Sequence, residues 1–455
     1  MHLDYLNIIT ADDLISLFQH ADNALAVEKE PSDPEEKPRF TTVNPEYGKR
    51  LLRLAEVFGN YLADKSLTRP FLYLILGPPG AGKSFLIEQL IKYLRASDSN
   101  NAKPIIFQQT NLSEMLEPRE LHQLYINIKN STNNKLTTVT LLDEFDIKWS
   151  GGSAIKYLIN PIYDGKFWNG YEFQKFGKCA FFFAGSYLQD RETLLRTQKL
   201  LAGVNLNKFL FDLYFGLQND GDVAGMQEIR EIQSLSYLHE KWRAEVDPRT
   251  DTIFYLSSLE KIKDFLSRVA GNIFEILDVS YPLHVTVNEF VVQGNSAEPS
   301  ARVKLNEVMD YVLYRLNAEG GKKTIVAYGA EENPLLEYKN MILCERVLRV
   351  IDFLRKRFND TFAKGDVYID RKLLNFLTVV PLINGMRSLE QLVAKLDRPD
   401  GQKINAHRFK PADVSMIIYE AEKFGDPERV WAELLRNNPN APTPASDEIL
   451  IPAAK

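Results

Sequence analysis

The sequence predicts an α/β fold in which a parallel sheet is covered by helices on both faces and is followed by a mainly helical domain. Apolar segments of strand length alternate with amphipathic segments of helix length. The segment "KCAFFFAGS", residues 178–186, is an unbroken apolar run, which suits a strand buried on both faces. The segment "LILGPPGAGKSFLIEQL", residues 74–90, passes from a strand through a glycine-rich turn into a helix.

The expected elements follow in alternating order along the chain. An amphipathic helix precedes the first strand, and each later strand is separated from the next by a helical segment. The helices are expected over 46–64, from about residue 83, and over 113–130 and 152–165; the strands over 71–77, 103–110, 136–146 and 178–186; and a helix running into a strand over 262–277.

The domain organisation can be predicted from changes in composition. An [ST]-x-x-[DE] start at Thr10 and Asp13 predicts a short helix, and the charged, proline-rich segment "EKEPSDPEEKPRF" after it is typical of a linker. We expect this helix and linker over 1–39, the α/β domain over 40–280 with an inserted helical segment at about 190–258, a mainly helical lid domain over 281–400, and C-terminal helices with a disordered tail over 401–455.

The pattern between residues 281 and 335 is mixed. A strand is expected over 283–294 and a helix over 302–318, after which the chain is expected to be helical to residue 397. The last segment, "NNPNAPTPASDEILIPAAK", has no periodicity and is rich in proline and alanine, which is typical of a disordered tail.

Composition sets limits on the class of protein. At 455 residues, with 45% hydrophobic and 25% charged residues, the chain is typical of a globular protein with two to three compact units. The net charge of −6 argues against a protein whose main role is to coat nucleic acid. Cys179 and Cys344 are the only cysteines, so we expect two core thiols rather than a disulfide framework or a zinc cluster.

The sequence also bears on the compartment. No apolar run reaches the roughly 18 residues that a membrane helix needs, and the N-terminal segment "MHLDYLNIITADDL" carries acidic residues where a signal peptide has basic ones. We therefore expect no membrane association and a cytoplasmic location.

The glycine-rich turn has the spacing G-x-x-x-x-G-K-[ST]. Backbone N–H groups in such a turn can close around phosphate oxygens, Lys83 adds a positive charge near the β- and γ-phosphates, and Ser84 can ligate Mg²⁺. The pattern predicts binding of ATP with Mg²⁺; the alternative is a tight turn with a surface lysine. The expected binding residues are Gly77, Pro78, Pro79, Gly80, Ala81, Gly82, Lys83, Ser84 and Phe85.

Acidic residues end the strand "TTVTLLDEFD". Asp143 is expected to hold the Mg²⁺ and Glu144 to orient the attacking water, because this strand end lies beside the phosphate loop in such sheets. A solvated turn is the alternative. Asp146 is either a supporting acid or, more in keeping with its position, a helix N-cap. Ser186 would lie between the two strand ends if its own strand lies between them, and could contact the γ-phosphate or be a plain turn hydroxyl.

Arg268 ends a short predicted helix. The guanidinium fork stabilises the charge that spreads over a transferring phosphoryl group, which makes an arginine near phosphates a candidate catalytic residue. Its position alone is more typical of a surface arginine at a helix C-terminus.

Five segments together resemble the AAA+ ATPase family. In chain order, "GPPGAGKS", "LLDEFD", "FFFAGS", "DFLSRVAGNIFEI" and "INGMRSLEQL" are similar to its Walker A, Walker B, sensor 1, arginine finger and sensor 2 motifs. More narrowly, "NLSEM", "LLDEFD", "IKYLINPIYDGKF" and "GMRSLEQL" resemble a bacterial group with a DEFD Walker B and a G-x-R-S sensor 2. The resemblance covers roughly residues 70–395.

The resemblance implies roles that the residues alone do not establish. It implies that Glu144 and Lys83 act in catalysis, that Arg268 reaches the nucleotide of a neighbouring subunit, and that Arg387 touches the phosphates of its own subunit from the lid. It also implies a homo-oligomeric, hexamer-like ring.

Two features depart from the family pattern. The segment between Ser186 and Arg268 is longer than the pattern requires, and its aromatic cluster forms either a partner-binding surface or a small satellite core. The region "QQTNLSEMLEPREL" also lacks the aromatic residue with which peptide-threading members grip their substrate. The aromatic cluster of the insertion is Phe209, Phe211, Tyr214 and Phe215, and a substitute gripping loop would use Tyr163, Phe167 and Trp168.

The sequence therefore predicts an ATPase that hydrolyses ATP with Mg²⁺ at subunit interfaces. Hydrolysis would drive a conformational change in an unidentified protein partner, either by remodelling it or by a nucleotide-gated scaffold, in bacterial defence. The alternative is a DNA-associated nucleotide switch, in which nucleic acid is the less favoured partner. The basic residues of "ERVLRVIDFLRKRF" would serve it, although a solvated helix face explains them as well: Arg346, Arg349, Arg355, Lys356 and Arg357.

Overall fold

The computed structural model describes most of two compact units. The described residues are 40, 42, 45–97, 104–202, 249–279, 334–430 and 448–451, apart from 68, 134–135 and 420, together with four short strands between 290 and 327. One unit contains residues 49–277, and the other contains residues 278–455. The N-terminal helix expected at Thr10, the linker, and the aromatic cluster of the insertion lie outside the described residues.

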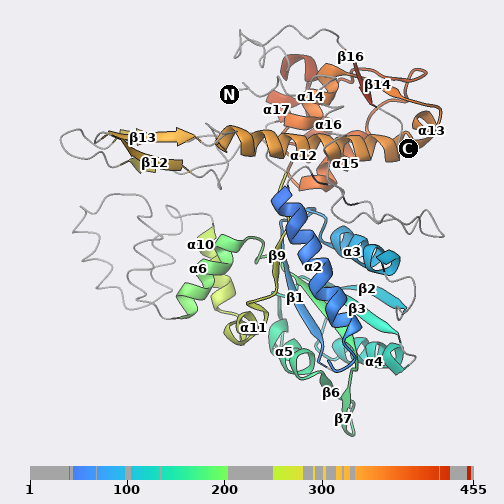
Figure 1. Ribbon diagram of the computed structural model, residues 1–455, viewed down its shortest axis with the longest axis vertical. Helices are drawn as coiled ribbons and strands as arrows, with labels where there is room; N and C mark the ends of the chain where they lie inside the picture. Colours follow the sequence, from blue (N-terminus) through green and yellow to red (C-terminus); the bar gives the residue numbers. More distant parts are fainter. Residues whose placement is uncertain are drawn as a thin grey trace. The chain divides into compact units, whose positions relative to one another are not determined.

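The first unit is built on a five-stranded parallel sheet (Figure 1). Its strands are β1 (Phe71–Leu76), β2 (Ile105–Asn111), β3 (Thr137–Asp143), β8 (Cys179–Ala184) and β9 (Ile273–Glu275). Their spatial order is β2-β3-β8-β1-β9, so β8 lies between β1 and β3. The predicted parallel sheet and its expected strands are confirmed.

Helices of the first unit occupy the segments between the strands. They are α2 (Pro45–Ala63), whose first residues up to 48 belong to the second unit, α3 (Lys83–Ser97), α4 (Glu120–Asn133), α5 (Ala154–Asp164) and α11 (Ile262–Val269). A short 3-10 helix, η3 (Leu112–Glu114), precedes α4. The insertion begins with α6 (Arg191–Leu201), and the chain returns through α10 (Arg249–Ser257).

Alternate residues of the strands pack against helices on opposite faces of the sheet. Phe182 makes an edge contact with Phe58 of α2, with ring centroids 5.5 Å apart. Its neighbour Phe183 makes an edge contact with Phe265 of α11 at 4.9 Å. Every residue of β8 is buried, as expected of a strand covered on both faces. The predicted two-sided covering of the sheet is confirmed, and Cys179 is a core thiol.

Two small hairpins follow the acid-bearing strand. The first joins β4 (Lys148–Trp149) to β5 (Gly152–Ser153), and the second joins β6 (Lys166–Trp168) to β7 (Phe173–Lys175). The second projects beyond the sheet at the lower end of the first unit in Figure 1.

The second unit is mainly helical and contains a three-stranded sheet. The helices are α12 (Pro334–Arg357), α13 (Asn359–Phe362), α14 (Arg371–Val379), α15 (Gly385–Ala394), α16 (Pro411–Val414) and α17 (Ala421–Phe424). The sheet has the order β15-β14-β16, with β14 (Val367–Asp370), β15 (Lys403–Ile404) and β16 (Glu448–Ile451). The expectation of an uninterrupted helical region up to residue 397 is wrong at β14.

The expected disordered tail contains an ordered strand. Strand β16 pairs antiparallel with β14, and its residues Ile449 and Ile451 are fully buried in the core of the second unit. The prediction of disorder is wrong at Glu448–Ile451, because a strand of four residues, set in a segment rich in proline and alanine, depends on a distant partner strand.

The helix expected over 302–318 is also wrong where the structure describes it. Strand β11 (Ala301–Val303) pairs with β10 (Phe290–Val292), within the strand expected over 283–294, and β12 (Tyr314–Glu319) pairs with β13 (Lys322–Ala327). The Gly-Gly pair between β12 and β13 is a hairpin signal, and the cross-strand pairing that it permits outweighs the local helical pattern.

No described helix has the length and apolar character needed to cross a membrane.

Candidate nucleotide-binding site

The glycine-rich loop joins the end of β1 to the start of α3. Gly80 and Gly82 have φ angles of 78° and 91°, in the left-handed region that glycine adopts without strain. A Cβ atom at Gly77 would lie 3.3 Å from the Cβ of Ile276, so a side chain there would crowd the loop. The bare backbone and its curvature form a cradle in which N–H groups can approach an anion.

Positive charge is concentrated at this loop. Helix α3 begins at Lys83 and carries no acidic residue in its first turn, so its N-terminal dipole is not neutralised from within the helix. The Lys83 ammonium donates to the carbonyl oxygens of Gly77, at 2.9 Å, and Pro78, at 3.3 Å. The helix start and the lysine therefore direct positive charge at the same place, as a phosphate-binding site requires.

The acidic pair lies at the end of β3. Asp143 is the last residue of that strand and is in register with Asn111 of β2 and Ala184 of β8. One of its oxygens accepts from the backbone N–H of Glu144 at 3.2 Å. Glu144 has a φ of 55°, which is costly for a residue with a Cβ and is typical of strained functional positions.

A glutamine that the sequence did not single out lies beside the acid pair. The Gln109 amide nitrogen on β2 is 3.5 Å from the second oxygen of Asp143. Strand pairing places Gln109 next to the strand end, because its register partner on β3 is Leu141. Sequence pattern alone gives no signal for this neighbour, since glutamine within a strand is common on exposed edges.

Ser186 follows β8, which lies between β1 and β3. The strand order therefore meets the condition on which its predicted location depended, and its backbone stands between the loop strand and the acid strand. Its role toward a phosphate stays a prediction.

Asp146 connects the acid strand to the segment after β8. Its carboxylate accepts from the backbone N–H groups of Ser186, Tyr187 and Leu188. The expectation that Asp146 caps a helix is wrong, since the next element is strand β4. The residue fits instead the other interpretation, a supporting acid, and it acts on backbone groups about forty residues away.

Phe85, in the first turn of α3, is exposed and lies beside a second ring that the sequence did not indicate. The centroid of Phe40 is 6.1 Å from that of Phe85, and Phe40 itself is buried. The two rings place an aromatic surface next to the phosphate-binding loop.

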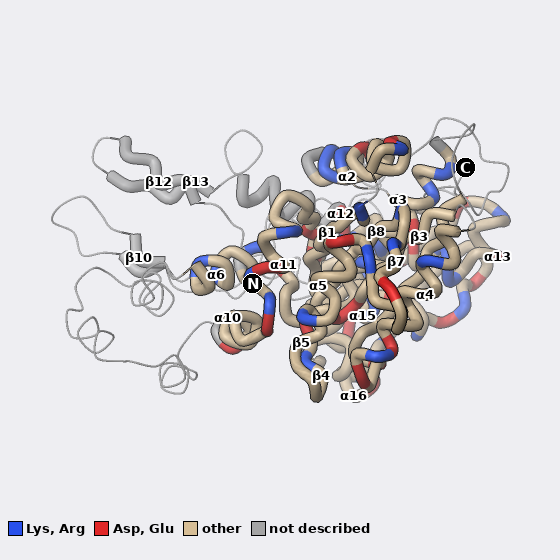
Figure 2. The backbone as a smooth tube through the Cα atoms, turned by 90° about the horizontal axis from the view of Figure 1, so that it is seen from below, with Lys and Arg blue, Asp and Glu red and all other residues tan. Residues whose placement is uncertain are grey.

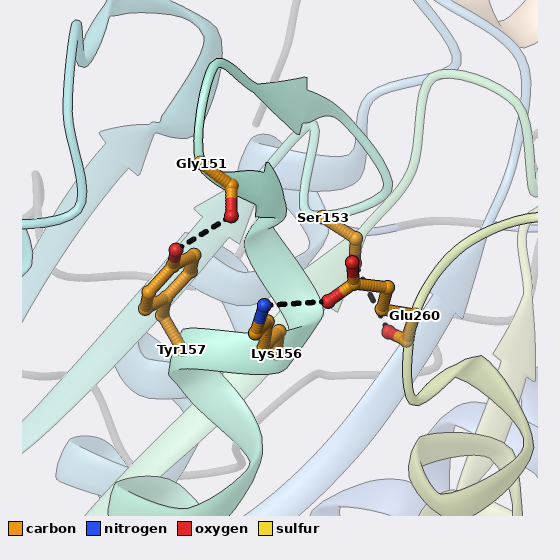
Figure 3. A network of polar contacts seen from close by, with 5 residues as sticks. All are labelled: Gly151, Ser153, Lys156, Tyr157 and Glu260. Atoms are coloured by element: carbon orange, nitrogen blue, oxygen red, sulfur yellow. Dashed lines mark hydrogen bonds and ion pairs between the residues drawn. The ribbon is translucent and has the colours of Figure 1, made fainter.

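A polar network holds the turn before α11 against α5 (Figure 3). The Lys156 ammonium lies 2.9 Å from the Glu260 carboxylate, and the Ser153 hydroxyl donates to the Glu260 carbonyl at 3.1 Å. The Tyr157 hydroxyl donates to the Gly151 carbonyl at 2.7 Å. The first two contacts join α5 and the residue before it to the turn that precedes α11, the helix that carries Arg268.

Arg268 lies at the opposite edge of the sheet from the loop. Its guanidinium carbon is 4.4 Å from the ring centroid of Tyr163, and the guanidinium carbon of Arg69 is 5.6 Å from the same centroid. Arg69 comes just before β1, whereas the glycine-rich loop follows it, and six strand residues span about 20 Å. That distance is longer than an arginine side chain, so Arg268 cannot reach the loop of its own chain.

The Arg268 side chain also retains unused hydrogen-bonding capacity. Its Nη1 atom is buried and has no hydrogen-bond partner among the residues that the structure describes. A buried donor of this kind costs free energy unless another group accepts from it.

Arg387 lies in the second unit, in the first turn of α15, and is exposed. The N–H of Asn384, just before the helix, donates to the Ser388 hydroxyl at 2.9 Å, which stabilises this helix start. Its expected contact with phosphates stays a prediction.

The aromatic residues proposed for a gripping loop have different environments. Phe167 is buried and packs on Phe176 at 5.0 Å, so it serves the core. Tyr163 lies under Arg268. Trp168 is half exposed on the β6–β7 hairpin. The three residues therefore do not form one exposed gripping surface.

The basic helix proposed for DNA contact is not a single basic face. Arg346 is fully buried and donates to the carbonyl oxygens of Leu377, Val380 and Val279, and burial lowers its pKa. A buried Arg346 fits neither a basic helix face that contacts DNA nor a solvated helix face, so both interpretations are wrong for this residue. Figure 2 shows basic and acidic residues interspersed along the elements of each unit.

No family model matches the chain, and no curated protein matches it. Several solved structures are partly similar. Drosophila ORC bound to DNA is 13% identical with a TM-score of 0.25 and covers 51% of this chain and 63% of its own. The Aeropyrum pernix ORC1 protein in complex with DNA is 12% identical with a TM-score of 0.25, covering 52% and 63%. C. elegans PCH-2 is 13% identical with a TM-score of 0.22, covering 49% and 69%.

This chain therefore spans 63% of the length of the Drosophila ORC chain. These similarities do not assign the site, whose chemistry follows from the residues of this chain.

Proposed function

We propose that the chain is an AAA+ ATPase that binds Mg·ATP at the carboxyl edge of its sheet and is completed by a neighbouring copy. The observation that carries the proposal is the strand order, in which β8 separates β1 from β3 and so brings Lys83, Asp143 and Ser186 to one edge. Arg268, the remaining catalytic candidate, lies at the other edge. A closed arrangement of identical subunits satisfies both facts, because each copy then offers its amino edge to the carboxyl edge of the next.

The residues at the carboxyl edge fit Mg·ATP. Mg²⁺ in nucleotide sites takes one or two protein oxygens together with phosphate oxygens, and Ser84 and Asp143 can supply them. When bound, the ion neutralises charge that develops on the phosphates. The cradle from Gly77 to Gly82 holds the phosphates through backbone N–H groups, while Lys83 offsets their charge.

Glu144 is the proposed general base. It lies directly after the metal-binding acid, and its left-handed backbone conformation sets its direction away from that of a continuing strand. A carboxylate at this place can orient and polarise the attacking water. Ser186 would contact the γ-phosphate or that water, and the exposed ring of Phe85, which lies beside the buried ring of Phe40, offers a stacking surface for the base.

Arg268 from a neighbouring copy would stabilise the charge that spreads over the transferring phosphoryl group. The stacking on Tyr163 keeps the guanidinium in a defined position, and its buried Nη1 atom is a donor that still lacks an acceptor among the described residues. We further propose that Arg387 senses the phosphates within its own subunit, and that the assembly is a hexamer-like ring.

We propose that turnover changes the conformation of a protein partner in the cytoplasm, in bacterial defence. A DNA-associated switch is the weaker candidate, because Arg346 is occupied by backbone carbonyls and Arg349 lies 3.5 Å from Glu345.

Isothermal titration with Mg·ATP tests the binding step. Lys83→Ala should lose measurable affinity, because the charge of the γ-phosphate is left uncompensated in the cradle. The matched control is Lys175→Ala, an exposed lysine on β7, which should bind as the wild type does. Unchanged affinity in Lys83→Ala would overturn the assignment of the site.

A further inference from the structure

We propose that Asp146 is a positioning residue for hydrolysis, which holds the segment of Ser186 in fixed relation to the proposed general base Glu144. This inference rests on the proposed ATPase function. It assigns to the second aspartate of "DEFD" a task distinct from metal binding and from catalysis itself.

Three consecutive backbone N–H groups converge on the Asp146 carboxylate. Ser186 donates to one oxygen at 2.8 Å, and Tyr187 and Leu188 donate to the other at 2.9 Å and 2.8 Å. Successive N–H groups that point to one centre form a concave anion site. Here the anion comes from the chain itself, so the segment after β8 is tied to the segment after β3.

The carboxylate is enclosed by its surroundings. Asp146 is fully buried, and burial raises its pKa while the three N–H groups act in the opposite direction. A Cβ atom at Gly185 would lie 2.4 Å from a carboxylate oxygen, so only glycine leaves room for this contact. Such a tight fit transmits a displacement of either segment to the other.

The position of Asp146 in the sequence relates these hydrogen bonds to the proposed general base. Asp146 lies two residues after Glu144, and Phe145 between them donates its N–H to the Ala184 carbonyl at 3.3 Å. The segment that carries the general base is therefore bound at two successive points to the segment that leads to Ser186. A fixed geometry between the general base and a group that contacts the γ-phosphate or the attacking water is what rapid hydrolysis needs.

Contacts of Tyr255 link Asp146 and the segment of Ser186 to the insertion. The Tyr255 hydroxyl on α10 donates to the Asp146 carbonyl at 3.1 Å, and its ring lies 4.1 Å from that of Tyr187. Helix α10 is where the chain returns from residues 203–248. The insertion thus has a direct route to the segment that Asp146 holds.

Asp146→Asn distinguishes positioning from general stability. An asparagine has one acceptor oxygen, which can serve Tyr187 and Leu188, while its NH₂ group would then face the Ser186 N–H. Hydrogen exchange in the absence of nucleotide should speed up at Ser186 at least 10-fold and less at Leu188. The ATPase kcat should fall about 10- to 100-fold with KM for ATP within about 2-fold, the range of one lost charge-assisted hydrogen bond.

The matched control is Asp190→Asn, in the same segment. Asp190 caps α6 by accepting from the Thr193 N–H at 2.8 Å, and asparagine caps a helix equally well. This variant should keep the exchange pattern and the kcat of the wild type. Equal losses in both variants would show that any change in this segment lowers activity, which would overturn the specific role of Asp146.

A second variant guards against misfolding of Asp146→Asn. Gly185→Ala keeps the charge of Asp146 but displaces its carboxylate, and it should give the same split between kcat and KM. Its control is Gly271→Ala, where an added Cβ meets no atom within 4 Å. In the Ser186→Ala background, Asp146→Asn should lower kcat by clearly less than in the wild type, since both act through one segment.

The outcomes separate the two proposals. No turnover by the wild type would contradict the proposed ATPase and with it this inference. The positioning role alone would be contradicted by either of two results in a protein whose wild type hydrolyses ATP. In the first, the kcat of Asp146→Asn is unchanged; in the second, its affinity for ATP falls by the same factor as its kcat.

Discussion

The two edges of the parallel sheet hold the two groups of residues that the proposed catalytic site requires. At the carboxyl edge, strand ends bring together the glycine-rich loop, Asp143, Glu144 and the segment of Ser186. At the amino edge, Arg268 lies on Tyr163 near the chain that enters β1.

The difference follows from direction along the chain. In a parallel sheet every residue after a strand lies at one edge, and every residue before a strand lies at the other. In the proposed assembly, one copy therefore holds the phosphate-binding half of one site and the arginine of another.

Removing the arginine should have the largest effect on this division. Arg268→Ala should bind ATP and hydrolyse it about 10³-fold or more slowly, the scale of an arginine finger. Mixing it with Lys83→Ala should restore part of the activity, because each protein supplies the edge that the other lacks. Steady-state turnover of the mixture measures this recovery.

Arg69→Ala is the control, because Arg69 shares the Tyr163 ring but is not the proposed catalytic cation. An effect equal to that of Arg268→Ala would make the cluster, rather than one arginine, the functional unit. Full activity from an isolated monomer would contradict the division between copies.

Glu144→Gln changes a proposed catalytic residue at the carboxyl edge and leaves the amino edge unchanged. It should keep Mg·ATP binding and lower kcat about 10²- to 10⁴-fold, since glutamine fills the space but polarises water poorly. The ATP state should then persist, with a stable higher oligomer by native mass spectrometry and a protein partner retained on pull-down. Asp143→Ala, which lacks the metal ligand, should show neither.

The control is Glu172→Gln, an exposed glutamate on the β6–β7 hairpin. It should behave as the wild type in all three measurements. A Glu144→Gln protein with normal turnover would show that another acid is the base, and recovery of nucleic acid in place of protein would favour the DNA-associated alternative.

A smaller effect is expected from changes at Tyr163, which packs against Arg268 at the amino edge. Tyr163→Leu removes the ring on which the Arg268 guanidinium rests, so kcat should fall about 3- to 10-fold through the loss of one cation–π contact. Tyr163→Phe keeps the ring and should retain turnover. An unchanged kcat in Tyr163→Leu would mean that the stacking does not set the position of Arg268.

The smallest effect is expected from the ion pair that Figure 3 shows. Lys156→Ala removes the 2.9 Å contact with Glu260, but the two side chains are 45% and 53% exposed, so water and salt already screen the pair. The urea midpoint and kcat should both stay within error of the wild type. A large loss of turnover would show that this ion pair, rather than the packing of α11, positions Arg268 at the amino edge.

The fold of the first unit could be largely predicted from the sequence because its signals are local. The apolar run of β8, the spacing around Lys83 and the acids after β3 each lie within a few consecutive residues. The predicted strands are confirmed for this reason, and so are the helices between them, except that the helix expected over 113–130 is divided into η3 and α4 with a turn over 115–119 between them.

The second unit was predicted less well because one of its signals is long-range and another is locally ambiguous. Strand β16 forms about 80 residues after β14, its partner in the chain. Strand β12 became a strand rather than a helix through its pairing with β13. Local periodicity cannot reveal a partner so far along the chain or choose between two structures that both suit a short apolar segment.

The sequence by itself was enough to predict which residues would bind phosphate and metal, because that prediction depends on residue type and on spacing in one short loop and one strand end. Only the tertiary structure decided where the other groups act. It enclosed Arg346 among carbonyl groups, tied Asp146 to amides about forty residues away, and placed Arg268 at the edge opposite its own loop. These outcomes depend on strand order and burial, which arise from contacts between distant segments and leave no pattern in neighbouring residues.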